Sequence, residues 1–463
     1  MLVNRKIHFE VSERKVLLRI FDSLFILFLL FITGNVLKIN YFEISLYYYL
    51  VPILVVYINI FGTVFEMYNL QIANNRYSIF KSIVLCTTTT VALFILTPYY
   101  TPVLPSNRYQ ILIFFGSVFF ALLIWRLFYI QFLVSHRFVK KVILVCDKNQ
   151  VEELVFGLEK NDFHYKIMGY VNTDSEQNED LEEDFIENIT IDTIENFVTQ
   201  NGVSEIVIAA KKTDGITPSL YNHLIHLLES GFTIRDYTQV YEDITHRIPV
   251  QYVTKDFYKY FPFSRSNQNQ LYLFLIRILD VLFSITGLLI IAIITPIILI
   301  INFIANRGDL FYTQERVGKN GEIFNIYKFR SMVKNAEKDG AVFATTNDMR
   351  VTPFGKFLRK SRIDEFPQFI NILKGDMSVI GPRPERPVFV YEIAQQMPFY
   401  QTRHVIKPGL TGWAQVSYPY GASIEDSLMK LEYDLYYIKH RSLYLDLKIT
   451  FKTLSTILFF RGQ

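Results

Sequence analysis

Two adjacent carboxylates, Asp364 and Glu365, stand among fixed positive charges in the C-terminal third of the chain. Arginine and lysine residues precede them closely, and Arg383 follows inside a rigid Gly-Pro-Arg-Pro turn. Neighbouring carboxylates repel each other unless a cation intervenes, and Mg²⁺ is such a cation, bound by one or two carboxylates together with substrate phosphates. Arginines bind phosphate oxygens through paired hydrogen bonds, which leaves one carboxylate to attack phosphorus. The pattern predicts a site for a phosphorylated substrate.

An isolated Asp-Glu pair beside arginines is more often an ordinary cluster of surface salt bridges. Residues 359–385, however, combine glycine, proline, arginine and carboxylates at high density, and they follow an apolar run at 281–304. This combination favours a binding site for an anionic substrate at the surface of a bilayer. Two further polar segments that contain glycine, 314–332 and 403–415, belong to the same region.

Composition places part of the chain in lipid. Of 463 residues, 51% are hydrophobic and only 20% are charged, so a soluble protein of this length would expose too much apolar surface. The 47 basic and 44 acidic residues give a net charge of +3, which argues against a protein that wraps nucleic acid. The only cysteines, Cys86 and Cys146, exclude a disulfide framework and a zinc site.

Four apolar stretches open the chain, and each is long enough to cross the hydrocarbon core as a helix. Basic residues precede the first stretch, lie between the second and third, and follow the fourth. This distribution predicts a four-helix transmembrane bundle over residues 1–137 with both ends on the cytoplasmic side, and a retained N-terminus. The stretches are residues 16–34, 44–65, 79–97 and 109–134.

Short apolar strands alternate with helical patterns over residues 138–250, which predicts a doubly wound, Rossmann-like α/β domain in the cytoplasm. The turn after the first strand, 147–150, has no glycine-rich phosphate-binding pattern. A degenerate domain with a structural or regulatory role is therefore favoured over a dinucleotide-binding one, and we expect it to be dispensable for chemistry. Residues 251–270 are predicted to be a linker.

The fifth apolar run, 281–304, leaves two alternatives. Its length would allow it to span the membrane. Pro296 interrupts the helical hydrogen bonds, however, and the charges on both flanks are similar, which favours a re-entrant helix that enters the bilayer and turns back. We adopt the re-entrant interpretation, although the sequence supports the two almost equally.

Residues 271–463 resemble the catalytic domain of the bacterial sugar transferase family, the monotopic polyprenyl-phosphate phosphoglycosyl transferases. The whole chain is similar to the long form of that family, and residues 417–435 resemble its exopolysaccharide subgroup. The fold implied is a membrane helical bundle, a Rossmann-like α/β middle domain and an α+β monotopic catalytic domain with a re-entrant helix. The resemblance rests on the segments QERVGKNGEIFNIYKFRSM, FLRKSRIDE, KGDMSVIGPRPE and RHVIKPGLTGWAQ.

The resemblance implies transfer of a phospho-sugar from a UDP-sugar to undecaprenyl phosphate, with release of UMP and a requirement for Mg²⁺. This reaction is the first membrane step in the synthesis of exopolysaccharide, capsule or O-antigen, at the bacterial inner membrane. The family's nucleophile corresponds to Asp364, which forms a dyad with Glu365 close to the metal. The break in its re-entrant helix corresponds to Thr295 and Pro296. Its phosphate-contacting positions correspond to Lys328, Arg330, Arg359 and Arg383.

Two rival interpretations fit the sequence less well. A membrane-anchored nucleotide-sugar dehydratase or epimerase needs a glycine-rich turn and a Tyr-x-x-x-Lys pair in the middle domain, and neither is present. A scaffold has no use for a carboxylate dyad among arginines. Trp413 is expected to pack a turn or a membrane edge, with stacking on uridine as the alternative. The large N-terminal portion without visible chemistry indicates either a homodimer interface or a regulatory role.

Overall fold

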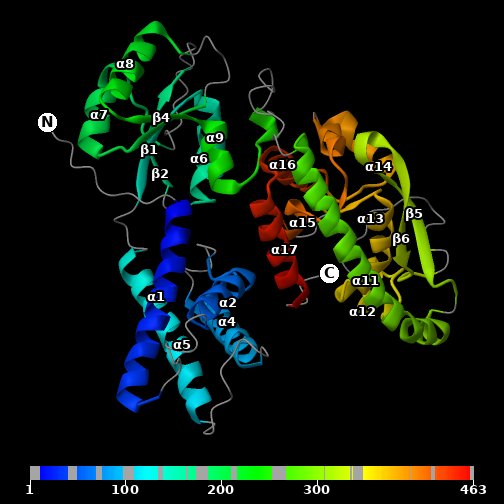
Figure 1. The fold of residues 1–463 in the computed structure, drawn as a ribbon. Coiled ribbons are helices and arrows are strands. Elements are labelled where there is room, and N and C mark those ends of the chain that lie inside the picture. The colour runs from blue at the N-terminus through cyan, green and yellow to red at the C-terminus, as the bar shows by residue number, and fades with distance from the viewer. Residues whose placement is uncertain are drawn as a thin grey trace. The chain divides into compact units, whose positions relative to one another are not determined.

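The computed structural model divides the chain into two compact units, Met1–Val139 and Lys140–Gln463 (Figure 1). The colour of the ribbon in Figure 1 changes from blue at the N-terminus to red at the C-terminus. The structure describes residues 11–39, 50–68, 76–96, 109–133, 139–162, 165–173, 186–209, 216–252, 267–306, 308–333, 336, 348–397, 399–418 and 423–458.

The first unit consists of apolar helices, as the sequence predicts. Among the described residues, α1, α4 and α5 are long and apolar enough to cross a membrane, whereas α2 has only 15 residues. Arg126 and Asp22 form a buried ion pair that joins α5 to α1, with Nη2 and Oδ2 2.6 Å apart. A π-helical turn, Tyr129–Leu133, follows α5. The helices are α1 Val11–Leu37, α2 Leu50–Val64, α4 Arg76–Leu96 and α5 Tyr109–Phe128.

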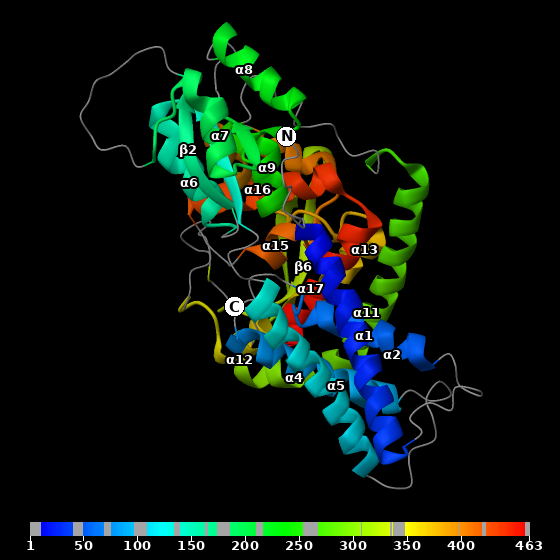
Figure 2. The same ribbon diagram turned by 90° about the vertical axis from the view of Figure 1, so that its left-hand side faces the viewer.

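The middle of the chain forms a four-stranded parallel sheet in the order β2-β1-β3-β4. Side chains of β1 are buried on both faces, which explains its unbroken apolar run. Helices α6 and α9 cover one face and α7 and α8 the other (Figures 1 and 2). The predicted α/β layout with a parallel sheet is confirmed. The elements are β1 Lys140–Cys146, α6 Val151–Glu159, β2 Tyr165–Asn172, α7 Ile194–Asn201, β3 Glu205–Ile208, α8 Pro218–Glu229, β4 Thr233–Asp236 and α9 Tyr237–Thr245.

The remainder of the second unit packs around a long helix and a hairpin. It contains α11 Gln270–Ala305, β5 Phe311–Val317, β6 Ile323–Phe329, α12 Pro353–Lys360, the 3₁₀ segment η9 Ile363–Gln368, α13 Phe369–Lys374, β7 Ser378–Ile380, α14 Pro387–Gln396, the 3₁₀ segment η10 Tyr400–Val405, β8 Gly409–Thr411, α15 Trp413–Ser417, α16 Ile424–His440 and α17 Leu443–Leu458. Strands β5 and β6 pair antiparallel, and β7 pairs with β8 in parallel.

The segment after α9 belongs to the C-terminal core. Ile248 and Val250 are buried in the same cluster as Trp413. The guanidinium of Arg247 lies 3.7 Å from the carboxylate of Glu432 on α16, and both side chains are buried. The predicted linker, 251–270, lies largely outside the described residues. The middle sheet and the C-terminal part are therefore joined by packing as well as by the chain.

Helix α11 is continuous through Pro296. Its side chains face two different environments. One face packs on the domain that follows, and at Gly287 any side chain would collide with Phe369 of α13. The opposite face is apolar and exposed, with Ile293 75% and Phe303 80% exposed. Such a surface is suited to lipid rather than to water.

Candidate active site

A reversal of the chain brings the carboxylate dyad to the start of η9. Helix α12 ends at Lys360, and Arg362 then adopts a left-handed conformation with φ +60°, which is uncommon for a residue with a side chain. Asp364 and Glu365 follow in the first turn of η9, each only 7% exposed. A backbone conformation that is costly for arginine is thus maintained two residues before the first of two buried carboxylates.

Strand β6 lies against η9 because α13 is tied to it by one side chain. Asn371 is fully buried, and its amide donates to the carbonyl of Asn325 at 2.7 Å and accepts from the N–H of Tyr327 at 3.1 Å. These contacts replace a missing neighbour strand at this part of the hairpin edge. They place Lys328, the next residue of β6, beside Glu365.

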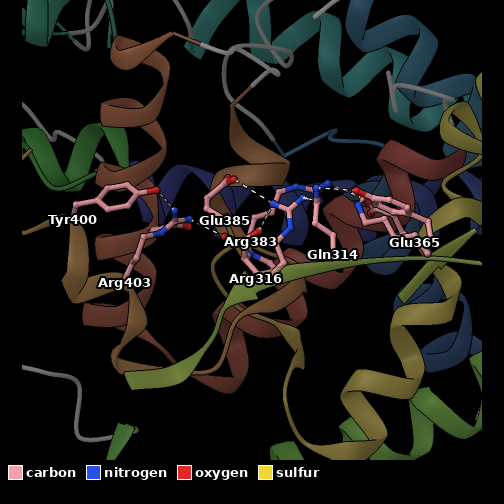
Figure 3. A network of polar contacts seen from close by, with 11 residues as sticks. Gln314, Arg316, Glu365, Arg383, Glu385, Tyr400 and Arg403 are labelled. Atoms are coloured by element: carbon pink, nitrogen blue, oxygen red, sulfur yellow. Dashed lines mark hydrogen bonds and ion pairs between the residues drawn. The ribbon is translucent and has the colours of Figure 1, made fainter. Parts of the chain in front are cut away.

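Glu365 lies among basic side chains, and Figure 3 shows its contact with Arg383. Its Oε1 accepts from Arg383 Nη2 at 2.7 Å and from Lys328 Nζ at 3.3 Å, and Arg362 Nη1 lies 3.8 Å from Oε2. Burial raises the pKa of Glu365, but Arg383, Lys328 and Arg362 outweigh this effect and hold the pKa below its usual range. Glu365 is therefore an anion that holds the surrounding cations in place.

Asp364 has a different environment. Its Oδ1 is buried and has no hydrogen-bond partner among the described residues. Burial and, second, the charge of Glu365 raise the pKa of Asp364 from 3.8 to about 6, although Lys328, Arg359 and Arg362 act in the opposite direction. An ionised carboxylate with one uncommitted oxygen in a dry, cationic site has the properties of a nucleophile for phosphorus.

The other predicted phosphate ligands occupy two different places. Arg359 of α12 donates from Nε to Ser331 Oγ at 3.0 Å, and its charge acts on Asp364. Arg330 instead lies against the end of α11, where its Nη2 donates to the carbonyl of Asn306 at 3.3 Å. Lys328 and Arg383 thus contact Glu365 directly, whereas the described hydrogen bonds of Arg330 are with Asn306 and Leu310, in the segment that follows α11.

The donor set fits a magnesium ion that is completed by substrate oxygens. Among the described residues there is no group of three or more His, Cys, Asp or Glu side chains that could hold a metal by itself. Mg²⁺ commonly uses one or two carboxylates with water and phosphate as the remaining ligands. One carboxylate oxygen of Asp364 could bind the metal while the other attacks phosphorus, whereas Glu365 is engaged by basic side chains.

Three side chains near the site were not predicted from the sequence. The amide nitrogen of Gln368, in the same short segment η9 as Asp364, is buried without a hydrogen-bond partner in the part of the chain that the structure describes. Arg316 and Arg403 contact the backbone beside Arg383. The pattern DEFPQ contains Gln368, but nothing in its type distinguishes a ligand from an ordinary buried amide.

Trp413 is a packing residue, as expected. Its side chain is 3% exposed, and its Nε1 donates to the carbonyl of His246 at 3.1 Å. The ammonium groups of Lys448 and Lys452 lie 4.7 and 4.8 Å from the centre of its ring. The indole is therefore enclosed by protein and does not offer an open face to a uridine base.

Comparison with known proteins identifies the family of the C-terminal part of the chain. The family model described as bacterial sugar transferase matches residues 271–460, and one described as a CoA-binding domain matches residues 63–214. EpsL, an uncharacterized sugar transferase of Bacillus subtilis (strain 168), is 35% identical over 193 residues, which cover 90% of its length and 40% of this chain. The chain belongs to the bacterial sugar transferase family.

Longer relatives are matched over part of their length. The UDP-N-acetylgalactosamine-undecaprenyl-phosphate N-acetylgalactosaminephosphotransferase of Aeromonas hydrophila is 39% identical over 257 residues, 55% of this chain and 59% of the relative. The UDP-glucose:undecaprenyl-phosphate glucose-1-phosphate transferase of Klebsiella pneumoniae is 42% identical over 170 residues, 36% of this chain and 37% of the relative. The match therefore spans less than two thirds of either relative.

Proposed function

We propose that the protein transfers a phospho-sugar from a UDP-sugar to undecaprenyl phosphate, releases UMP and starts the synthesis of a bacterial polysaccharide. The observation that carries this proposal is the contrast within the dyad, in which Glu365 is held by cations while Asp364 keeps a buried, uncommitted oxygen. The names of the relatives support the same substrates, because they describe phosphotransferases that use undecaprenyl phosphate.

In the first step, a carboxylate oxygen of Asp364 attacks the phosphorus that carries the sugar. The bond from this phosphorus to the bridging oxygen breaks, and UMP leaves with that oxygen. The product is an acyl phosphate between Asp364 and the sugar. Lys328 and Arg383 are placed to stabilise the negative charge of the phosphoryl oxygens, since they already converge on Glu365 at the same site.

In the second step, a phosphate oxygen of undecaprenyl phosphate attacks the same phosphorus. The bond between phosphorus and the carboxylate oxygen breaks, which restores Asp364 and yields undecaprenyl-diphosphate-sugar. Mg²⁺, the proposed cofactor, would be held by Asp364 and the substrate phosphates and would neutralise their charge. Glu365, also predicted as a ligand, would act mainly by fixing the basic residues.

The lipid acceptor requires a site at the level of the membrane headgroups, and α11 supports a re-entrant placement. Near its start, Asp280 accepts from the N–H of Val379 at 2.8 Å, and near its end Asn302 donates to the carbonyl of Gly308 at 2.8 Å. Between them, Ile291 and Ile298 on either side of Pro296 pack in one cluster with the catalytic part. Contacts with the same domain on both sides of Pro296 favour a helix that does not cross the bilayer.

The apolar helices make the chain a membrane protein. We propose that it lies in the inner membrane with the middle domain and the catalytic part in the cytoplasm. The basic residues before the first apolar stretch, between the second and third, and after the fourth support this orientation. Homodimer formation stays a prediction.

The test is a UMP-release assay of the purified full-length protein with undecaprenyl phosphate, Mg²⁺ and a panel of UDP-sugars. We expect UMP release with at least one donor, dependent on both lipid and Mg²⁺ over many turnovers. Asp364→Asn keeps the size of the side chain but removes the attacking charge, so it should abolish turnover. Turnover by this variant at the rate of the unmodified protein would contradict the assigned nucleophile.

A further inference from the structure

The turn that carries Arg383 is held through its carbonyl groups. Two of the four residues 382–385 are prolines, which have no N–H to donate. The turn therefore has few N–H groups of its own to bond its carbonyls. Each of its four carbonyls instead accepts a hydrogen bond from another element. The N–H of Gly409 donates to the first carbonyl at 2.9 Å, and the N–H of Val317 donates to the last at 2.9 Å.

Side chains hold the two carbonyls in the middle. Arg316 Nη1, from β5, donates to the carbonyl of Pro384 at 3.1 Å. Arg403 Nη2, from η10, donates to the carbonyl of Arg383 at 3.0 Å. Figure 3 shows both guanidinium groups close to Arg383, whose own side chain reaches Glu365. Arg403 thus fixes the backbone of Arg383, whose side chain contacts Glu365 of the dyad.

Arg403 is itself held rigidly. It is 5% exposed, and it donates to the hydroxyl of Tyr400 and to Asp434 Oδ2, each at 2.7 Å. Phe399, directly before η10, adopts a left-handed conformation with φ +63°, which is rare for a bulky residue. A buried ion pair of this kind contributes little net stability compared with an apolar pair of similar shape. Its geometry, rather than its stabilising energy, is the feature that requires an explanation.

We propose that Arg403 is a positioning residue of the transferase, which acts by fixing the Arg383 carbonyl so that the Arg383 guanidinium meets the donor phosphate correctly. The inference rests on the proposed function. Paired hydrogen bonds to phosphate require accurate placement, and a shift of about 1 Å can cost roughly a hundredfold in rate. A lysine at 403 would keep a positive charge beside Asp434, but its single ammonium nitrogen could not occupy both positions from which Nη1 and Nη2 of Arg403 donate.

The test replaces the buried pair by apolar residues, Arg403→Met with Asp434→Leu, in the full-length protein. Helix α16 offers a matched control, Arg247→Met with Glu432→Leu, because that pair is equally buried and the described hydrogen bonds of Arg247 do not reach Arg383. We expect at least a tenfold loss of kcat/KM for the first double variant and less than a threefold loss for the control, at similar melting temperatures.

A cycle with Arg383→Ala separates positioning from general destabilisation. If Arg403 acts through Arg383, replacing the 403–434 pair should cause less than a twofold further loss in the Arg383→Ala background. Arg403→Lys provides a second route if the apolar pair fails to fold, and it should show the same dependence on Arg383. The same loss in both backgrounds, or an equal loss in the control, would overturn the inference. A failure of the unmodified protein to release UMP from any donor would instead refute the proposed function.

Discussion

Asp364→Asn should stabilise the protein while it abolishes activity. The pKa of this buried carboxyl rises from 3.8 to about 6 on folding, so the native state holds its proton more tightly than the unfolded state. Each tenfold change in acidity corresponds to 1.36 kcal/mol, and the ionised carboxylate therefore costs about 3 kcal/mol of folding free energy at pH 8. The cost falls to about half of that at pH 5, where the folded protein is mostly protonated at this position.

Thermal unfolding in metal-free buffer measures this effect. The protein has two tryptophans, and Trp125→Phe leaves only Trp413, which lies in the core of the catalytic part. In this background we expect Asp364→Asn to raise the Tm at pH 8 by roughly 5 °C, and by less at pH 5. A lower or unchanged Tm at pH 8, or a difference that does not decrease at pH 5, would refute the assigned environment of Asp364.

Asp348→Asn is a control with the opposite sign. Hydrogen bonds from Arg350 lower the pKa of Asp348 from 3.8 to about 2. A lowered folded-state pKa contributes stability that is present above the unfolded value and is lost only as the pH falls through the folded value. The Asn variant should therefore melt below the unmodified protein at both pH 8 and pH 5.

Three further outcomes are expected. In single-turnover UMP release, Glu365→Gln should shift the acid limb of the residual rate to lower pH, because an anion that opposes ionisation of Asp364 is removed; an upward shift would contradict this. Met349→Cys, at a position that is 97% exposed, should resist an impermeant thiol reagent in intact cells and react after permeabilisation; labelling from outside would refute the cytoplasmic placement. A protein truncated to begin at residue 246 should melt higher than one truncated to begin at 269, because the intervening segment supplies core residues; equal melting would contradict that role.

Parts of the fold with strong local signals could be predicted from the sequence. Strand β1 is a run of apolar residues buried on both faces, and α11 is too apolar to be anything but a membrane-associated helix. Helix α9 was not anticipated, although Tyr237, Val240 and Ile244 follow helical spacing, because the segment is short and mostly polar. The core role of Ile248 and Val250 depends on packing against α15 and α16, which no local pattern reports.

In the candidate site, too, some features could be predicted from the sequence and others could not. Asp364, Glu365 and Arg383 could be found because unusual residue types cluster along the chain. The different roles of the two carboxylates could not be predicted, because the uncommitted oxygen of Asp364 and the cations around Glu365 depend on three-dimensional contacts. Arg316 and Arg403 act on carbonyls that are 68 and 20 residues away in the chain. Backbone contacts of this kind leave no signature in a single sequence.

The most direct test of the account is a stoichiometric measurement without the lipid acceptor. The full-length protein is incubated with Mg²⁺ and the UDP-sugar that supports turnover, UMP is quantified per protein, and peptides are analysed by mass spectrometry. We predict release of one UMP per active site and a phospho-sugar adduct on Asp364, with neither in Asp364→Asn. UMP release that strictly requires undecaprenyl phosphate, with no adduct on the protein, would contradict the covalent mechanism and indicate direct attack by the lipid phosphate.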